Sequence, residues 1–284
     1  QAAAHETTDL SLAAPPRPPA WSREDRHRQQ ARSSCAILPL VVAVAADLAG
    51  QASLGSRTDE GAPDNRMMRW DLFCRVIDNH GDAGVCWRLA RRLVAVHGQR
   101  VRLWIDAPAV LARLWPAIDA QAARQVVAGV EIRHWRESLE AAECADAGDV
   151  VVEAFACELP APARAALQAR RSLWLNLEYL SAEAWVEGCH GLGSAQPGGR
   201  TRYFFFPGFT PATGGLIGAD AACAQWDERA ARAWLAAQGV TGPAAARRLS
   251  LFTYGNAALP GWLEALAAGD EPWLALVPDG RTLR

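Results

Sequence analysis

From Trp70 onwards, short apolar runs alternate with segments of helical periodicity, and no other feature limits the fold as strongly. Runs of this length suit strands that are buried on both faces of a parallel sheet. Strands are expected at 72–77, 101–105, 130–134, 150–155 and 172–177, with helices at 85–96, 110–114 and 160–169 between them. The alternation predicts an α/β fold with a doubly wound parallel sheet.

A second alternation starts near residue 221. It consists of a helix ending at Gly239, a strand at 249–254, a helix at 259–268 and a strand at 273–277. Two parallel strands cannot be covered on both faces, so this second unit looks incomplete. The expected division is therefore a Rossmann-like N-terminal domain at 67–190, an interdomain bridge at 191–218 and a truncated second Rossmann-like domain at 219–284.

Residues 1–66 differ in character from the rest of the chain. Four prolines at 15–19 are followed by polar runs that enclose one apolar stretch at 36–46. That stretch is too short to span a bilayer and lies far from the start of the chain, which disfavours a signal peptide. We expect 1–66 to be a disordered leader that is not part of the domain, and we expect no association with membranes.

Composition excludes several classes of function. The 29 basic residues are all Arg and are balanced by 31 acidic residues, which disfavours nucleic-acid binding by bulk charge. The absence of Lys excludes lysine Schiff bases and the lysine of phosphate-binding loops. The seven Cys and six His residues are scattered, without CxxC or HExxH motifs, so we expect no metal site and a reduced, cytoplasmic protein.

The turn at 78–84 is the leading candidate for chemistry. Asp78 is expected at the end of the first strand and Asp82 just before the next helix, where ligands of parallel sheets bind. The alternative is structural: Asp82 caps the helix and Asp78 ties down the turn, and on pattern alone the two readings are even. The glycines at 81 and 84 do not form GxGxxG, and two carboxylates repel phosphate, so the expected ligand is neutral or cationic.

Several long motifs in order resemble the EarP family of bacterial protein-arginine rhamnosyltransferases. They lie at 70–82, 85–91, 176–183, 203–210 and 213–216. The resemblance implies an inverting glycosyltransferase of the GT-B type, with an N-terminal acceptor domain and a nucleotide-sugar-binding domain facing a cleft. It implies transfer of L-rhamnose from the co-substrate dTDP-β-L-rhamnose to one arginine of translation elongation factor P, without a metal or other cofactor.

The family's site residues map onto matching positions. Asp82 corresponds to the proposed general base, and Asp78 to the partner that orients the acceptor. Phe252 and Tyr254, two residues apart on one expected strand, correspond to an aromatic pair around the thymine nucleotide, with Asn256 beside them. Without the resemblance, the two aromatic residues would be read as ordinary core.

Four further residues are weaker candidates. Glu178 and Tyr179 end a strand and are candidate acceptor contacts, although a hydrogen bond to a neighbouring helix is at least as good an explanation. Gly214 and Gly215 are candidates for close approach to phosphate, but a flexible turn explains them equally well.

The sequence also departs from the family pattern. Gly193 stands where a Pro is expected, and Gly255 where an acidic residue is expected. The family's later Arg-Gly-Glu-Asp-Ser segment, which completes the donor pocket, falls beyond Arg284. We therefore expect little or no transferase activity from this chain, the alternative function being that of a non-catalytic fragment that only binds elongation factor P.

Overall fold

The structure is a computed structural model of the 284-residue chain. The residues that it describes are 67–78, 80–218, 227–240, 242–243, 246–253 and 256–277. The predicted leader at 1–66 and Tyr254 lie outside the described residues.

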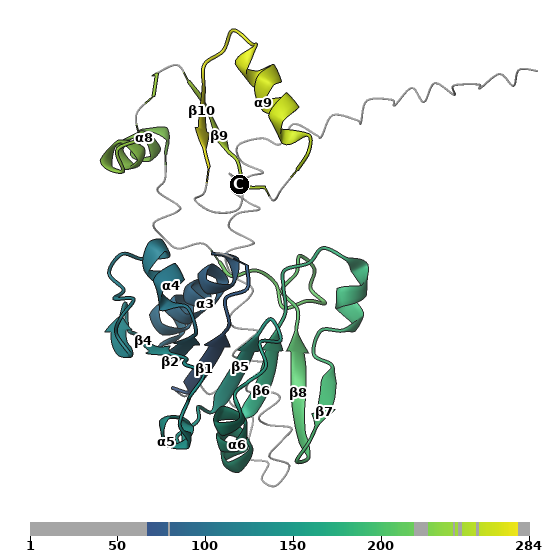
Figure 1. The fold of residues 1–284 in the computed structure, drawn as a ribbon. Helices are drawn as coiled ribbons and strands as arrows, with labels where there is room; N and C mark the ends of the chain where they lie inside the picture. The colour runs from purple at the N-terminus through teal and green to yellow at the C-terminus, as the bar shows by residue number, and fades with distance from the viewer. Residues whose placement is uncertain are drawn as a thin grey trace, which may run out of the picture.

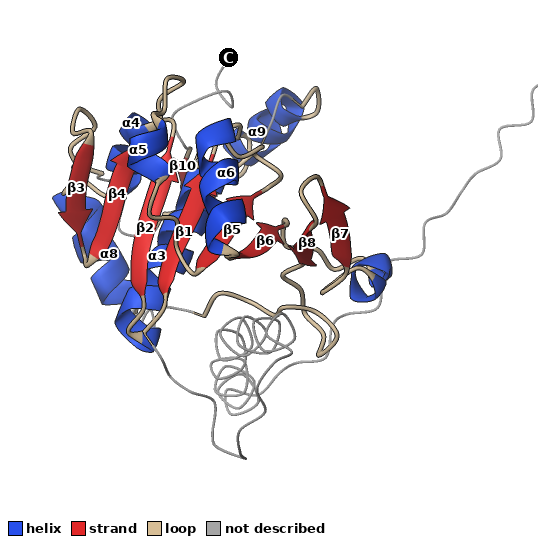
Figure 2. Ribbon diagram, turned by 90° about the horizontal axis from the view of Figure 1, so that it is seen from below, coloured by secondary structure: helices blue, strands red, loops and turns tan. Residues whose placement is uncertain are grey.

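The main element is an eight-stranded sheet with the strand order β3-β4-β2-β1-β5-β6-β8-β7, seen as a row in Figure 2. Its strands are β1 (Arg69–Cys74), β2 (Arg100–Ile105), β3 (Arg124–Val127), β4 (Val130–His134), β5 (Val150–Ala154), β6 (Leu173–Leu177), β7 (Gly193–Gln196) and β8 (Arg200–Phe205). All neighbours pair in parallel except the two edge strands, β3 and β7, which are antiparallel to β4 and β8. The predicted α/β fold with a parallel sheet is confirmed.

Helices cover both faces of this sheet. The helices of the N-terminal part are α3 (Gly81–His97), α4 (Pro108–Leu114), α5 (Ala141–Cys144) and α6 (Ala161–Arg170), followed by the 3-10 helix η1 (Ala184–Gly188). Alternate residues of β1 serve opposite faces, as the pleat of a strand requires. Leu72 packs in one core with Leu93 of α3 and Leu111 of α4, whereas Phe73 packs in the other with Leu167 of α6. Burial on both faces explains why these strands are continuously apolar.

The first strand starts and ends three residues earlier than the predicted 72–77. Val76 and Ile77 donate their backbone N–H groups to carboxylates, Val76 to Asp106 Oδ1 and Ile77 to Asp82 Oδ2, both at 2.9 Å. Ile77 is 74% exposed, so its apolar character does not mark a buried strand position. Side chains thus replace strand partners after Cys74, and the chain turns away from the sheet.

The predicted bridge at 191–218 is wrong over its first half. Residues Gly193–Gln196 and Arg200–Phe205 form β7 and β8 of the main sheet, so the N-terminal unit extends beyond residue 190. β7 contains no large apolar residue, and β8 starts with the polar run Arg200 to Arg202. Neither strand is therefore a continuous apolar run, which is the pattern that predicts buried strands.

A second, two-stranded parallel sheet holds β9 (Arg247–Ser250) and β10 (Trp273–Leu276), with α8 (Glu228–Ala237) and α9 (Leu259–Ala267). These elements are drawn in light green and yellow in Figure 1, apart from the main sheet. β9 ends four residues before the predicted end at 254, so Phe252 lies beyond it. Within the described part of the chain, the helices are too short or too polar to cross a lipid bilayer.

Candidate active site

The site lies where the order of strands reverses. From β1 the chain proceeds outwards to β2 and β4, then returns to place β5 on the other side of β1. Loops that leave the carboxyl ends of β1 and β5 therefore diverge, and in open α/β sheets ligands bind in the crevice between such loops. The loop after β1 carries Asp78, and the residues after β5 start with Phe155.

Asp82 is the centre of this site. It lies in the first turn of α3, is 1% exposed, and accepts the backbone N–H groups of Ile77 and Asp78 at Oδ2, both at 2.9 Å. Its other oxygen, Oδ1, accepts the Tyr179 hydroxyl at 3.0 Å. The N-cap residue of α3 is His80, not Asp82, so the bonds of Asp82 hold the preceding loop rather than the helix end.

Asp78 shares the site with Asp82. Its side chain is half-buried, and its backbone carbonyl accepts the N–H of Gly81 at 2.8 Å. Its Oδ2 lies only 3.3 Å from the position that a Cβ atom on Gly81 would take, so Gly81 leaves room for this carboxylate. Asp78 therefore does help to close the turn, through its backbone, while its carboxylate stays beside Asp82 and Tyr179.

Tyr179 connects this loop to the neighbouring strands. It follows β6, is 54% exposed, and stacks on Phe155 with ring centroids 4.2 Å apart and an angle of 11° between the planes. Burial of its hydroxyl, its hydrogen bond to Asp82 and the charges of Asp82 and Asp78 raise the pKa of Tyr179 to about 12. The hydroxyl therefore stays protonated at neutral pH and remains a donor.

Glu178 is bonded within the sheet. Its Oε1 accepts from Asn176 Nδ2 at 2.5 Å, and its backbone N–H donates to Phe205 O at 2.9 Å. Asn176 in turn accepts the N–H of Ala156, which follows β5. Of Glu178 and Tyr179, it is Tyr179 that makes the hydrogen bond to a helix, through Asp82 of α3. An acceptor contact of Glu178 stays a prediction.

Gly214 and Gly215 have structural explanations at the end of β8. A Cβ atom on Gly214 would lie 2.3 Å from Phe205 Cζ, and its N–H donates to Phe206 O at 2.8 Å. Gly215 has a φ of 71°, in the left-handed region that favours glycine. Close packing and backbone conformation therefore require these glycines, and their contact with phosphate stays a prediction.

The predicted donor residues are only partly described. Phe252 is 64% exposed and lies past the end of β9, so it is not on the predicted strand, and Tyr254, with which it was expected to share a face, lies outside the described residues. Asn256 precedes α9 and accepts the N–H of Ala258 at Oδ1, at 2.9 Å. A contact of Phe252 and Asn256 with a nucleotide stays a prediction.

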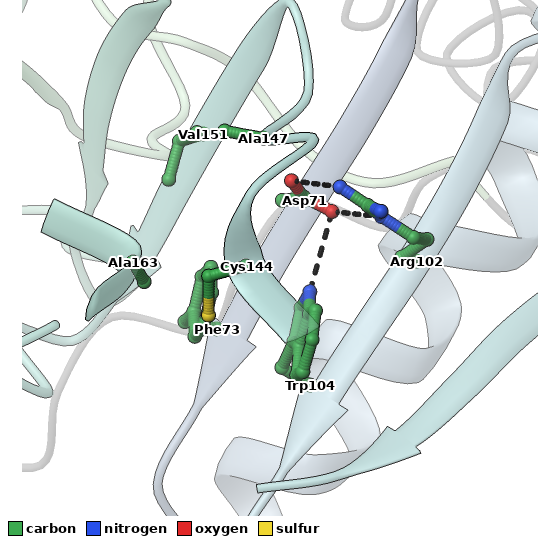
Figure 3. Close-up of a pocket in the computed structure, with 8 residues that line it drawn as sticks. All are labelled: Asp71, Phe73, Arg102, Trp104, Cys144, Ala147, Val151 and Ala163. Atoms are coloured by element: carbon green, nitrogen blue, oxygen red, sulfur yellow. Dashed lines mark hydrogen bonds and ion pairs between the residues drawn. The ribbon is translucent and has the colours of Figure 1, made fainter. Parts of the chain in front are cut away.

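A buried charge cluster lies elsewhere in the main sheet (Figure 3). Asp71 of β1 accepts from Arg102 Nε at 2.5 Å, Arg102 Nη2 at 2.6 Å and Trp104 Nε1 at 3.2 Å. The adjoining cavity has a volume of about 10 Å³, which holds one water molecule at most. This cluster therefore has no room for a substrate.

Two other features of the described residues limit the choice of site. A cavity of about 270 Å³ lies against α8 and β10, but its Arg232 and Arg248 both pair with Glu228.

Among the residues that the structure describes, no group of three or more His, Cys, Asp or Glu side chains is placed to hold a metal ion.

Sequence reasoning singled out Asp78 and Asp82 and named Tyr179 as a candidate acceptor contact, but it predicted neither the bond of Tyr179 to Asp82 nor its stack on Phe155. Tyr179 and Asp82 are 97 residues apart in the chain, and no spacing rule connects them. The one available signal was the position of both aromatic residues just after expected parallel strands, where side chains of different loops meet.

Comparison with known proteins matches this region to one family. Residues 70–284 match the family described as "Elongation-Factor P (EF-P) rhamnosyltransferase EarP". The chain is 50% identical over 225 residues to the protein-arginine rhamnosyltransferase of Pseudomonas aeruginosa, covering 76% of this chain and 59% of the relative. It is 51% identical to that of Pseudomonas putida, covering 75% and 58%, and 40% identical to that of Shewanella oneidensis, covering 75% and 58%.

A solved structure, described as "Structural basis for EarP-mediated arginine glycosylation of translation elongation factor EF-P", is 32% identical and has a TM-score of 0.37. The match covers 75% of this chain and 50% of that chain. The chain spans a little under three fifths of the length of the Pseudomonas relatives. Because the family match covers well over half of its residues, the chain belongs to the EarP family of Elongation-Factor P rhamnosyltransferases.

Proposed function

We propose that this chain carries the acceptor side of an inverting glycosyltransferase that moves L-rhamnose from dTDP-β-L-rhamnose to an arginine side chain of elongation factor P. The observation that carries the proposal is the cluster of Asp78, Asp82 and Tyr179 at the carboxyl end of β1. Family membership and the names of the relatives support the same reaction.

The carboxylates suit an arginine acceptor. A guanidinium stays protonated at any working pH and is a poor nucleophile, so a transferase has to hold it by charge and remove a proton. In the proposed step, a guanidinium nitrogen attacks C1 of rhamnose, the bond from C1 to the diphosphate oxygen breaks, and Asp82 accepts the proton. Asp78 holds the cation in place. A single displacement with one base and no covalent glycosyl-enzyme inverts the configuration at C1.

The donor side of the proposal rests on the second sheet. Phe252, Tyr254 and Asn256 are the proposed contacts of the thymine nucleotide, because an aromatic side chain such as Phe252, which is 64% exposed, suits stacking on a base. Backbone N–H groups at a helix start, rather than a metal ion, stabilise the leaving diphosphate in this proposal. A GT-B arrangement of two Rossmann-like domains, acting in the cytoplasm, is part of the same proposal.

A second candidate function is binding without catalysis. The main sheet is covered by helices on both faces, whereas the described part of the second sheet has two strands and its helix α9 buries no residue. This contrast favours a chain that holds elongation factor P at Asp78 and Asp82 while transferring rhamnose poorly or not at all.

Mass spectrometry distinguishes these functions. Elongation factor P is incubated with dTDP-rhamnose and either the 284-residue chain or a form extended to the length of its relatives, and a deoxyhexose on arginine is sought. We expect modification by the extended form and little by the 284-residue chain. Clear modification by the 284-residue chain would overturn the expectation that it is inactive.

Asp82→Asn tests the role of the base in the extended form. Asn keeps the size of Asp82 but cannot accept the guanidinium proton, so turnover should fall by about 10²-fold or more. The matched control is Asp106→Asn, because Asp106 also accepts a backbone N–H of the same loop, that of Val76. The control should retain most of the activity. Undiminished modification by Asp82→Asn would remove Asp82 from the role of base.

A further inference from the structure

The hydrogen bonds of Asp82 leave little of its carboxylate available. An ionised carboxylate has about four lone-pair sites. Oδ2 uses its two sites for the N–H groups of Ile77 and Asp78, and Oδ1 uses one for the hydroxyl of Tyr179. The remaining site on Oδ1 is therefore the position at which a buried Asp82 meets a further donor.

Tyr179 is itself held at both ends. Its hydroxyl is bound to Asp82, and its ring stacks on Phe155. The backbone beneath that ring is fixed by two hydrogen bonds, from Phe155 N to Leu177 O at 2.7 Å and from Ala156 N to Asn176 Oδ1 at 3.1 Å. Phe155 and Ala156 have φ values of 56° and 51°, a conformation that persists only where surrounding contacts enforce it.

We propose that Tyr179 is a positioning residue, whose hydroxyl fixes Oδ1 of Asp82 so that its one free lone pair receives the proton of the acceptor guanidinium. The inference rests on the proposed function and adds a residue to it. Tyr179 touches neither the sugar nor the nucleotide in this scheme and acts through Asp82. Without this hydroxyl the carboxylate would be held through Oδ2 alone, and Oδ1 could shift about that anchor. Misplacement of a reacting group by about 1 Å is enough to cost 10²-fold in rate.

The first test needs no enzymatic activity. Tyr in the 284-residue chain is labelled with ¹³C at Cζ, and the titration of Tyr179 is followed by NMR. The groups that act on its hydroxyl are Asp82, Asp78 and Cys74, while burial contributes the largest effect. In Asp82→Asn the pKa of Tyr179 should fall from about 12 by roughly one pH unit, because one charge is removed while burial remains.

Asp106→Asn is the control for this titration. Asp106 anchors the same loop through Val76 N but is not among the groups that act on Tyr179, so the pKa of Tyr179 should be unchanged. An unchanged pKa of Tyr179 in Asp82→Asn would overturn the inference, whatever the activity of the protein.

The second test uses Tyr179→Phe in the extended form. Phe keeps the stack on Phe155 and removes only the hydroxyl, so the protein should fold with an unchanged Tm. We expect kcat for arginine modification to fall about 10-fold, while KM for elongation factor P changes by less than about two-fold. The reason is that the lost hydrogen bond acts on the reacting carboxylate of Asp82 rather than on the binding of elongation factor P. Tyr203→Phe, in the middle of β8, removes a hydroxyl elsewhere in the sheet and should leave kcat unchanged.

The outcomes separate the inference from the proposed function. If Asp82→Asn abolishes turnover and Tyr179→Phe does not change kcat, the proposed function stands and the role of Tyr179 is wrong. If neither variant alters turnover, the proposed role of Asp82 as base fails and the positioning role of Tyr179 fails with it. A rise in KM alone in Tyr179→Phe would make Tyr179 an acceptor contact and would also contradict the positioning role.

Discussion

Gly214 shows how a single position constrains the region next to the site. A Cβ atom there would lie 2.3 Å from Cζ and 2.4 Å from Cε1 of Phe205, and 3.0 Å from Cε1 of His190. The Phe205 ring is buried in the main core and cannot move aside at low cost. The first glycine of the Gly214-Gly215 pair is therefore required by packing.

Gly214→Ala should destabilise the fold by about 1–3 kcal/mol, the usual cost of forcing an extra carbon atom into a packed core. Urea denaturation followed by Trp fluorescence measures the change. Gly188→Ala is the matched control, because nothing lies within 4 Å of the position of its Cβ atom. Equal denaturation midpoints for the two variants would contradict the packing role of Gly214.

At this scale the sequence predicts where Asp78 and Asp82 lie better than it predicts which side chains they contact. Asp78 and Asp82 follow from their place after an apolar run, since strand ends and helix starts are visible in the local pattern. The Tyr179 hydroxyl bond to Asp82 does not follow, because it depends on the register of β6 relative to β1 across β5. The local sequence pattern of each strand does not specify how β6 is aligned with β1.

The element β1 contains an unusual residue for a buried strand. Asp71 is 2% exposed and binds Arg102 of β2 through both carboxylate oxygens, while the N–H of Gly148 donates to its Oδ2 at 2.6 Å. Two adjacent strands and the turn before β5 thus meet at one carboxylate. A buried charge that loses its partner is costly because no water replaces the lost contact.

Asp71→Ala should therefore lower the free energy of unfolding by about 1.5–3 kcal/mol, since the buried Arg102 loses this partner but keeps its ion pair with Asp146 at 2.7 Å. Thermal and urea denaturation measure the loss. Arg170→Gln serves as the comparison, because its ion pair with Asp149 is between side chains that are both more than 40% exposed, and it should change little. A loss in Asp71→Ala no larger than in Arg170→Gln would show that the cluster contributes little to stability.

Two of the strands that sequence reasoning missed, β3 and β7, lie at the edges of the main sheet. β3 and β7 have four residues each, alternate between exposed and half-buried positions, and pair on one side only. Central strands are apolar because both faces are covered, and that is the signal by which they were predicted. An edge strand needs no such signal, since its neighbour supplies the hydrogen bonds and water covers the rest.

At the scale of the whole molecule, the 284-residue chain should bind elongation factor P weakly and in a manner that depends on salt. A guanidinium held by Asp78 and Asp82, next to the 54% exposed Tyr179, is screened by dissolved ions. Raising NaCl from about 50 mM to about 300 mM should weaken binding by about three- to ten-fold. NMR titration of labelled elongation factor P measures this, and no shift in the loop that carries its acceptor arginine would refute acceptor capture.

The strand order also has a consequence for how the chain folds. β1 stands at the centre of the sheet, yet Trp70 pairs on one side with Val150, and Tyr179 reaches Asp82 only after β6 has formed. During synthesis at roughly 5–20 residues per second, the carboxylate of Asp82 emerges about 5–20 s before the hydroxyl that binds it. Parallel pairing over such a separation is slow because the loop must close before any contact is gained. The contact between Asp82 and Tyr179 can therefore form only after β1 to β6 of the main sheet have been synthesised.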